Sequence, residues 1–345
     1  MHTCWNKEMN IKTNAANKTN NLPDWHETIK EELEIIESKL AEAVNSKVST
    51  VSEVSMHLLS AGGKRLRPAL VTLSAKSVGV EYNKERVTDI AAAAELVHMA
   101  TLVHDDVIDD AESRRGKVTA NIFWGNRISV LSGDCMLAKA FWFIAKETNK
   151  RVMQTLAETT VRMSESEVLQ AECEGSIEKW RQNYWQIIND KTAGFFSACC
   201  RCGAILAGAD KKTEQSLANY GTELGLAFQI TDDLLDITGD PKVTGKPAGG
   251  DIRDGKFTLP VLLALEQMPE TQRRITQGLV ERRNLTAQEV AAVCEAVCAT
   301  GGISEARNYA KAYIEKAISS ISSLPSSEAK NSLTAIARRV ITRNY

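Results

Sequence analysis

The chain has 345 residues, of which 43% are hydrophobic and 25% charged, so it is long enough to bury a large core. Its formal net charge of −2 excludes a general nucleic-acid binder, which needs a basic excess to neutralise phosphates. No run of about 18 apolar residues and no secretory signal occur, so we expect no transmembrane helix and predict a cytoplasmic protein.

The first elements that the sequence predicts are an N-terminal extension and long amphipathic helices. Residues 1–24 contain a tract rich in Asn, Thr and Lys, which indicates a disordered extension, and we expect one domain from residue 25 to residue 345. From Ile29 to Val44 apolar side chains recur at spacings of three and four, which is one face of a helix. The Ala-rich segment 88–102 predicts another helix.

The spacing of prolines supports a helical fold. No proline lies between Pro68 and Pro241, and no alternating strand pattern is found anywhere in the chain. A loop rich in Gly, Pro and Lys is expected at residues 241–254, and helices are expected to resume after it. We therefore predict an all-α fold, a single large helical bundle around a central cavity.

A turn with two glycines and three basic residues separates two of the predicted helices. Gly62 and Gly63 let the backbone turn and approach closely, and Pro68 suits the first turn of the following helix. Helix N-termini favour anions, and Lys64 and Arg67 add positive charge. The turn is a candidate anion site, although an ordinary capped turn with solvated bases would also fit.

The first of two aspartate clusters ends the helix predicted over residues 88–102. Asp105 and Asp109 are four residues apart and therefore share a helix face, with Asp106 between them. His98 lies two turns before Asp105, so it is a candidate for the same cavity. Three like charges within two turns repel one another, which predicts a cation that offsets them.

The second cluster repeats the spacing of the first. Asp232, Asp233 and Asp236 follow an apolar helical segment, as the first cluster does. Carboxylate oxygens are ligands that Mg²⁺ prefers, and Mg²⁺ commonly bridges protein carboxylates to substrate phosphates. One such cluster is compatible with a solvated helix face, but two with the same spacing in apolar surroundings favour magnesium.

Several further cations and polar residues supply candidate phosphate contacts. Both clusters offer sites for metal, while the basic residues offer direct sites for phosphate, which suits two diphosphate substrates. The residues beyond the turn at Lys64 are Arg114, Arg115, Lys191, Thr192, Lys246 and Lys256.

These motifs together resemble the trans-isoprenyl diphosphate synthases, the polyprenyl synthetase family, from about residue 25 to the C-terminus. Within the family the similarity is greatest to the catalytic subunits of heptaprenyl diphosphate synthases, with octaprenyl and solanesyl synthases as near relatives. The motifs are GGKRLRP (62–68), LVHDDVIDD (102–110), RRG (114–116), DKT (190–192) and FQITDD (228–233).

The resemblance implies a role for each matching residue. The expected magnesium ligands, with Asp106 assisting, are Asp105, Asp109, Asp232, Asp233 and Asp236. The expected contacts to the allylic diphosphate are Arg114, Lys191, Lys246 and Lys256. The expected contacts to isopentenyl diphosphate are Lys64, Arg67, His98 and Arg115. Thr192 and Gln229 would line the reacting centre.

The resemblance also implies an activity and a product. A magnesium-dependent prenyltransferase would add isopentenyl diphosphate repeatedly to an allylic primer such as farnesyl diphosphate. Ala100 and Thr101, five and four residues before Asp105, are small, which predicts an open tunnel for the growing chain. The expected product is therefore long, C35–C45, with heptaprenyl diphosphate as the first expectation. Such a product would supply a quinone side chain. The aromatic residues 141–143 predict either a deeper floor of that tunnel or ordinary core packing.

Three alternatives and one question of assembly stay open at this point. A shorter-chain geranylgeranyl-type synthase would share every motif. A class I terpene cyclase handles one diphosphate, so it has no need of Lys64, Arg67 and His98. A non-catalytic scaffold subunit tends to lose the Asp clusters, which this chain keeps. The resemblance implies either a homodimer or a heterodimer with a small regulatory subunit.

Overall fold

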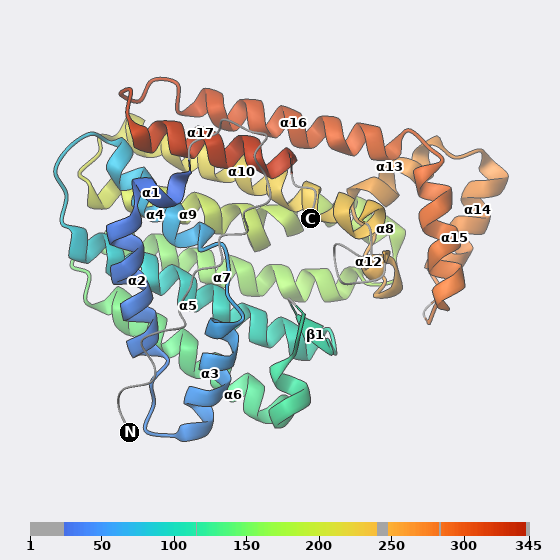
Figure 1. Cartoon of the computed structure of the whole chain (residues 1–345). Helices are drawn as coiled ribbons and strands as arrows, with labels where there is room; N and C mark the ends of the chain where they lie inside the picture. Colours follow the sequence, from blue (N-terminus) through green and yellow to red (C-terminus); the bar gives the residue numbers. More distant parts are fainter. Residues whose placement is uncertain (1–23, 115, 240–247, 283, 343–345) are drawn as a thin grey trace.

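The chain folds into long helices that run alongside one another, with a short β-hairpin near one end (Figure 1). The computed structural model describes residues 24–114, 116–239, 248–282 and 284–342. The hairpin pairs β1 (Ser113–Arg114) with β2 (Lys117–Val118) in antiparallel register, and the described residues contain no other strand. The all-α prediction is confirmed, and two strands of two residues are too short to show a period-2 pattern in the sequence.

The helices of the first half of the chain are α1 (Trp25–Thr28), α2 (Lys30–Ala43), α3 (Ser49–Ser60), α4 (Leu66–Ser77), α5 (Lys84–Ile108), α6 (Ala120–Ala145) and α7 (Lys150–Cys173). Those of the second half are α8 (Ile177–Ile188), the π-helix η1 (Asn189–Ala193), α9 (Gly194–Leu206), α10 (Lys211–Thr238), α12 (Gly250–Arg253), α13 (Leu259–Gln267), α14 (Glu270–Val280), α15 (Ala287–Cys298), α16 (Gly302–Ser320) and α17 (Glu328–Ile341).

Local sequence explains where the principal helices begin and which face they bury. The stripe predicted from Ile29 to Val44 forms α2 and its two flanking residues, and its apolar side chains lie in the core. Asn83 begins α5 by accepting a hydrogen bond from the backbone N–H of Arg86 (3.0 Å). The loop expected at 241–254 contains the short helix α12, and its residues 241–247 lie outside the described part of the chain. Of the extension expected at residues 1–24, only Asp24 is described.

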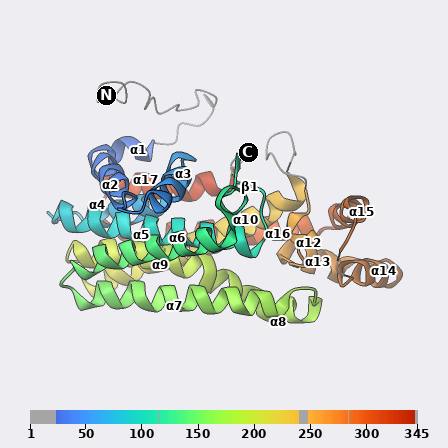
Figure 2. The same ribbon diagram turned by 90° about the horizontal axis from the view of Figure 1, so that it is seen from below.

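Three packed pairs of helices organise the bundle. α5 packs along α6, and α10 packs along α9 and α16, so α5 and α10 both lie inside the bundle. Figures 1 and 2 show α14 and α15 standing apart from the other helices at one end. Most buried apolar side chains form one large core, and a second core gathers around α8, the C-terminal half of α10 and α13.

α6 is the most apolar long helix of the fold. By length and composition alone it could cross a membrane. However, 39% of its most apolar stretch is buried inside the fold, and core helices of soluble proteins can be equally long and apolar. Its outward face carries Phe141 and Trp142, whereas Phe143 points into the core. Phe141 and Trp142 therefore fit neither alternative, tunnel floor or core packing, whereas Phe143 packs in the core.

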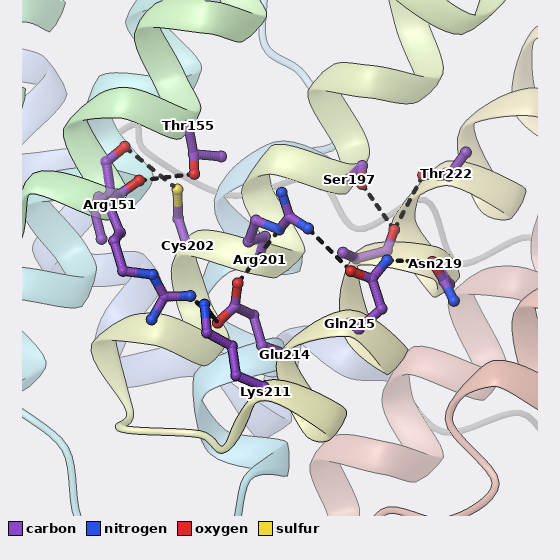
Figure 3. A network of polar contacts seen from close by, with 12 residues as sticks. Arg151, Thr155, Ser197, Arg201, Cys202, Lys211, Glu214, Gln215, Asn219 and Thr222 are labelled. Carbon is purple, nitrogen blue, oxygen red and sulfur yellow. Dashed lines mark hydrogen bonds and ion pairs between the residues drawn. The ribbon is translucent and has the colours of Figure 1, made fainter.

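A network of charges joins α7, α9 and α10 at the start of α10. The buried carboxylate of Glu214 contacts the guanidinium of Arg151, the Arg201 Nε (3.6 Å) and the Lys211 Nζ (3.9 Å), as Figure 3 shows. Along α10, 18 residues separate Glu214 from Asp232, which is roughly 27 Å of helix. The network therefore belongs to the scaffold, far from the Asp clusters.

Glu214→Gln is expected to lower the free energy of unfolding by about 1–3 kcal/mol, because it removes the buried carboxylate that pairs with the guanidinium groups of Arg151 and Arg201. Chemical denaturation monitored by circular dichroism measures the change. Glu270→Gln, at an exposed pair with Arg274 on α14, is the control and should change stability by less than about 0.5 kcal/mol. Equal effects of the two variants would contradict this account.

Candidate active site

One large cavity opens between the ends of α5 and α10. Its volume is about 970 Å³, and the turn before α4, the middle of α7 and η1 also contribute walls. The sequence-predicted residues that line it are Lys64, Arg67, His98, Ala100, Thr101, Asp105, Arg114, Lys191, Thr192, Gln229 and Asp232. The fold thus brings together residues from five separate segments of the sequence.

The three carboxylates of the first cluster have different surroundings. Asp106 is buried and accepts a hydrogen bond from Arg114 Nε (2.6 Å). Asp109 accepts one from Lys256 Nζ (2.8 Å), which ties the segment after α12 to the end of α5. Asp105 lines the cavity, and its carboxylate has no hydrogen-bond partner among the described residues.

Burial raises the pKa of Asp105 to about 6, because desolvation penalises its charged form more than Lys191 and Arg114 favour it. The repulsion of Glu167 and Asp109 adds to this shift. Burial lowers the pKa of Lys256, but the neighbouring Asp109 reverses this and holds it above its usual range. A carboxylate with a raised pKa beside a cavity is a candidate functional group, since an incoming cation would offset its charge.

The second cluster divides in the same way. Asp232 lines the cavity. Asp233 is 2% exposed and points away from it, accepting hydrogen bonds from the Tyr184 hydroxyl (2.7 Å) and from Gln229 Nε2 (3.0 Å). Burial raises the pKa of Asp233 to about 7. Asp236 is half-buried and accepts hydrogen bonds from the backbone N–H groups of Gly250 and Asp251, both at 3.1 Å.

Close packing brings η1 against the second cluster. A Cβ placed on Gly225 of α10 would lie 2.5 Å from the Cα of Ala193, so only glycine allows this approach. The contact sets Thr192 beside Gln229, and the Thr192 Oγ1 donates a hydrogen bond to the Gln229 Oε1 (2.8 Å). π-Helical turns are frequent at functional sites, and this one carries both Lys191 and Thr192.

The basic residues line the cavity from several directions. Lys191 Nζ is held by Glu167 (2.8 Å) and by Gln170 Oε1 (3.2 Å), both on α7. Arg67 lies over the rings of Phe195 and Phe196, at 5.2 and 5.3 Å from their centroids. Arg115 and Lys246, also expected here, lie outside the described residues.

Comparison with known proteins connects this geometry to a family. The family model described as polyprenyl synthetase matches residues 48–297. Heptaprenyl diphosphate synthase component 2 from Geobacillus stearothermophilus is 37% identical over 92% of this chain and 97% of its own. Octaprenyl diphosphate synthase from Escherichia coli strain K12 is 35% identical over 94% of this chain and 99% of its own.

Solved structures agree with these relatives. A polyprenyl synthase from Caulobacter crescentus CB15, crystallised with calcium and isoprenyl diphosphate, superposes with a TM-score of 0.89 and 33% identity, over 93% of this chain and 97% of its own. The chain belongs to the polyprenyl synthetase family. As a member it is a prenyltransferase enzyme of the polyprenyl diphosphate synthase kind.

Small and apolar residues also line the cavity in this polyprenyl synthetase. Ala100 and Thr101 are among them, as their position before Asp105 predicts. Leu137 of α6 and Met163 of α7 face the same space and were not singled out from the sequence, because a core leucine or methionine looks the same there as a wall residue. Glu167 was not among the predicted site residues either, yet it holds Lys191.

Arg65 is a further residue that sequence reasoning left unassigned. It has the left-handed φ of +46° at the start of α4, which is uncommon for a residue with a side chain. Its guanidinium donates to Glu37 (2.5 Å) and to the buried Glu95 (3.0 Å), and these contacts hold the turn that carries Lys64 and Arg67. The spacing of residues in the sequence does not predict a positive φ at an arginine.

The donor set fits Mg²⁺ that is shared with a phosphorylated substrate. Among residues 24–114, 116–239, 248–282 and 284–342, no group of three or more His, Cys, Asp or Glu side chains could hold a metal ion by itself. Mg²⁺ usually takes one or two carboxylates and completes its shell with water and substrate phosphates. Asp105 on α5 and Asp232 on α10 both line the cavity, so each could supply one carboxylate to such an ion.

Proposed function

We propose that this chain is a magnesium-dependent synthase that condenses farnesyl diphosphate repeatedly with isopentenyl diphosphate to give an all-trans C35–C45 prenyl diphosphate, heptaprenyl as the first candidate. One observation carries the proposal. A single cavity is lined both by carboxylates and cations and by small or apolar side chains. Such a cavity suits a substrate with an anionic head and a hydrocarbon tail.

The carboxylates and nearby cations of the cavity would hold the allylic diphosphate. Asp105 and Asp109 on α5 and Asp232 and Asp236 on α10 are the proposed ligands of Mg²⁺, with Asp106 orienting Arg114. When bound, Mg²⁺ would neutralise negative charge on the diphosphate. The proposed direct contacts to the same group are Arg114, Lys191, Lys246 and Lys256.

The turn before α4 would hold isopentenyl diphosphate. Lys64 and Arg67 flank the cavity on one side and His98 on another, and Arg115 is proposed to complete the set. His98 and Arg114 also line a small pocket next to the main cavity.

The residues that line the cavity then act together on the reaction. The allylic C–O bond breaks, and its electron pair leaves with the diphosphate, whose growing negative charge Lys191 and Arg114 stabilise. The double bond of isopentenyl diphosphate, held close by its own cations, attacks the allylic carbon to form the new C–C bond. A proton then leaves the product and is taken up by the released diphosphate, and the apolar wall keeps water away.

Small wall residues support a long product. Ala100 and Thr101 are small residues among those that line the cavity together with Asp105. Relatives of this chain are named for products from geranylgeranyl to decaprenyl diphosphate. The geranylgeranyl product is therefore the second candidate, whereas a terpene cyclase has no use for the second group of cations around Lys64.

The names of two relatives suggest how the chain assembles with other subunits. Two of them are named as component 2 of a heptaprenyl diphosphate synthase, which supports a small partner subunit for this chain. A homodimer is the alternative that needs no second gene product.

The test incubates the purified chain with farnesyl diphosphate, radiolabelled isopentenyl diphosphate and Mg²⁺, and sizes the dephosphorylated products by chromatography. A C35–C45 product supports the proposal, and a C20 product supports the second candidate. Inactivity that is restored by adding the small subunit of a two-component relative indicates the heteromeric form. No prenyl product under either condition, or with geranyl diphosphate as primer, would overturn the proposal.

A further inference from the structure

Tyr184 has no part in the reaction just proposed, yet it contacts the second Asp cluster. It lies on α8, is 1% exposed and belongs to the second apolar core. A phenol hydroxyl in such a core needs a hydrogen-bond partner. Its partner is the Asp233 Oδ2 at 2.7 Å, 49 residues further along the chain.

Both oxygens of the Asp233 carboxylate are engaged by protein donors. Oδ2 accepts from Tyr184, and Oδ1 accepts from the Gln229 Nε2 at 3.0 Å. The carboxylate is 2% exposed and does not line the cavity, in contrast to its neighbour Asp232. Asp233 is thus a buried hydrogen-bond acceptor that joins the Tyr184 hydroxyl to the Gln229 amide.

Gln229 connects the buried Asp233 carboxylate to the cavity. Its amide nitrogen is fixed by Asp233, and its amide oxygen accepts from the Thr192 Oγ1 at 2.8 Å. Turning the amide by 180° would set its oxygen against the Asp233 carboxylate, acceptor against acceptor, whereas the Thr192 hydroxyl can donate or accept. Gln229 and Thr192 both line the cavity, so one orientation of the amide dipole faces the substrates.

We propose that Tyr184 is a positioning residue that fixes the Gln229 amide through Asp233, and that Asp233 serves as this link and is not a ligand of Mg²⁺. The inference rests on the proposed function, since it assigns the amide to the reacting centre of that reaction. A dipole held in place before charge develops stabilises the transition state more than the bound substrates. Loss of the link should therefore lower kcat and leave KM nearly unchanged.

Tyr184→Phe tests the link directly, because it removes the hydroxyl that donates to Asp233 and leaves the ring in place. We expect kcat to fall about tenfold, with KM for both diphosphates and the Mg²⁺ concentration for half-maximal rate within about twofold of the original protein. Tyr220→Phe is the matched control. Tyr220 is equally buried, and its hydroxyl donates to the Leu333 carbonyl oxygen (2.8 Å), away from the cavity.

Two further comparisons separate positioning from metal binding. Asp233→Asn keeps the shape but loses one of the two accepted hydrogen bonds, so we expect a lower kcat with an unchanged Mg²⁺ requirement. Asp232→Asn is expected to raise that requirement strongly. In the double variant, Tyr184→Phe should add almost nothing to the effect of Gln229→Ala, because Tyr184 acts only through the amide that Gln229→Ala removes.

The outcomes are distinct. Equal kcat values for Tyr184→Phe and Tyr220→Phe would overturn the inference, as would an Asp233→Asn protein whose Mg²⁺ requirement rises as much as that of Asp232→Asn. Should Tyr184→Phe fail to fold by circular dichroism, Asp233→Asn still decides between the two roles. Failure of the proposed function would appear separately, as an original protein that makes no prenyl product from both diphosphates and Mg²⁺.

Discussion

Asp105→Asn is expected to lower the rate of prenyl transfer at least about a hundredfold and to raise the melting temperature of the metal-free protein by a few degrees. The carboxylate lies half-buried at the cavity, and desolvation raises its pKa to about 6. Its ionised form at neutral pH therefore opposes folding until a cation arrives, and asparagine keeps the shape without the charge. Steady-state kinetics and calorimetry without Mg²⁺ measure the two effects.

The matched control for this experiment is Asp110→Asn. Asp110 is exposed just beyond the cluster, and asparagine tolerates its positive φ of 46°. Activity and melting temperature should both stay close to those of the original protein. An Asp105→Asn protein that retains more than a tenth of the original rate would refute the assignment of Asp105 to metal binding.

The raised pKa of Asp105 also predicts the dependence on pH. The folded protein holds this proton up to about pH 6, whereas the unfolded chain releases it near its ordinary value of 3.8. Stability from this group is therefore present at low pH and is lost as pH rises toward 6. Metal binding needs the ionised form, so the Mg²⁺ concentration for half-maximal rate should increase as pH falls from 7 to 5. A flat profile over that window would contradict the prediction.

Ala100→Phe is expected to shorten the product from C35–C45 to C15–C20. Ala100 faces the cavity on α5, and a phenyl ring there would enter the empty space below the Asp105 carboxylate. Ala100 is buried in a small apolar cluster as well as lining the cavity, so circular dichroism must first show that the variant folds. Chromatography of dephosphorylated products measures chain length. Ala41→Phe, on the exposed face of α2, adds the same ring elsewhere and should leave the product unchanged.

An Ala100→Phe protein with the original product distribution would show that the tunnel does not pass α5 at this level. Leu137 and Met163 would then be the next positions to enlarge, since they line the opposite side of the same cavity.

The sequence was sufficient for features that depend on local spacing. The stripe from Ile29 to Val44 predicts α2 because helical periodicity is a property of neighbouring residues. The four-residue spacing of Asp105 and Asp109 likewise predicts carboxylates near one another at the end of a helix. Family motifs extended this to the residues that gather at the cavity from distant segments.

Features that depend on three-dimensional packing could not be predicted. Asp232 and Asp233 are adjacent in sequence, yet one lines the cavity and the other is buried, because the outcome depends on a phenol 49 residues away. The close approach of Gly225 to Ala193 is likewise invisible, since a glycine within a helix has no periodic signature. The outward face of Phe141 and Trp142 depends on which side of α6 meets α5.

The single π-helical turn at Asn189–Ala193 makes this part of the sequence sensitive to length. A wide turn holds one residue more than an α-helical turn, and each residue of an α-helix advances the side chains by about 100°. Deleting one residue here would restore a regular helix and rotate Lys191 or Thr192 away from the cavity. Insertions and deletions in this segment should therefore be far less tolerated than substitutions, although the segment lies within an otherwise unbroken helical run from α8 to α9.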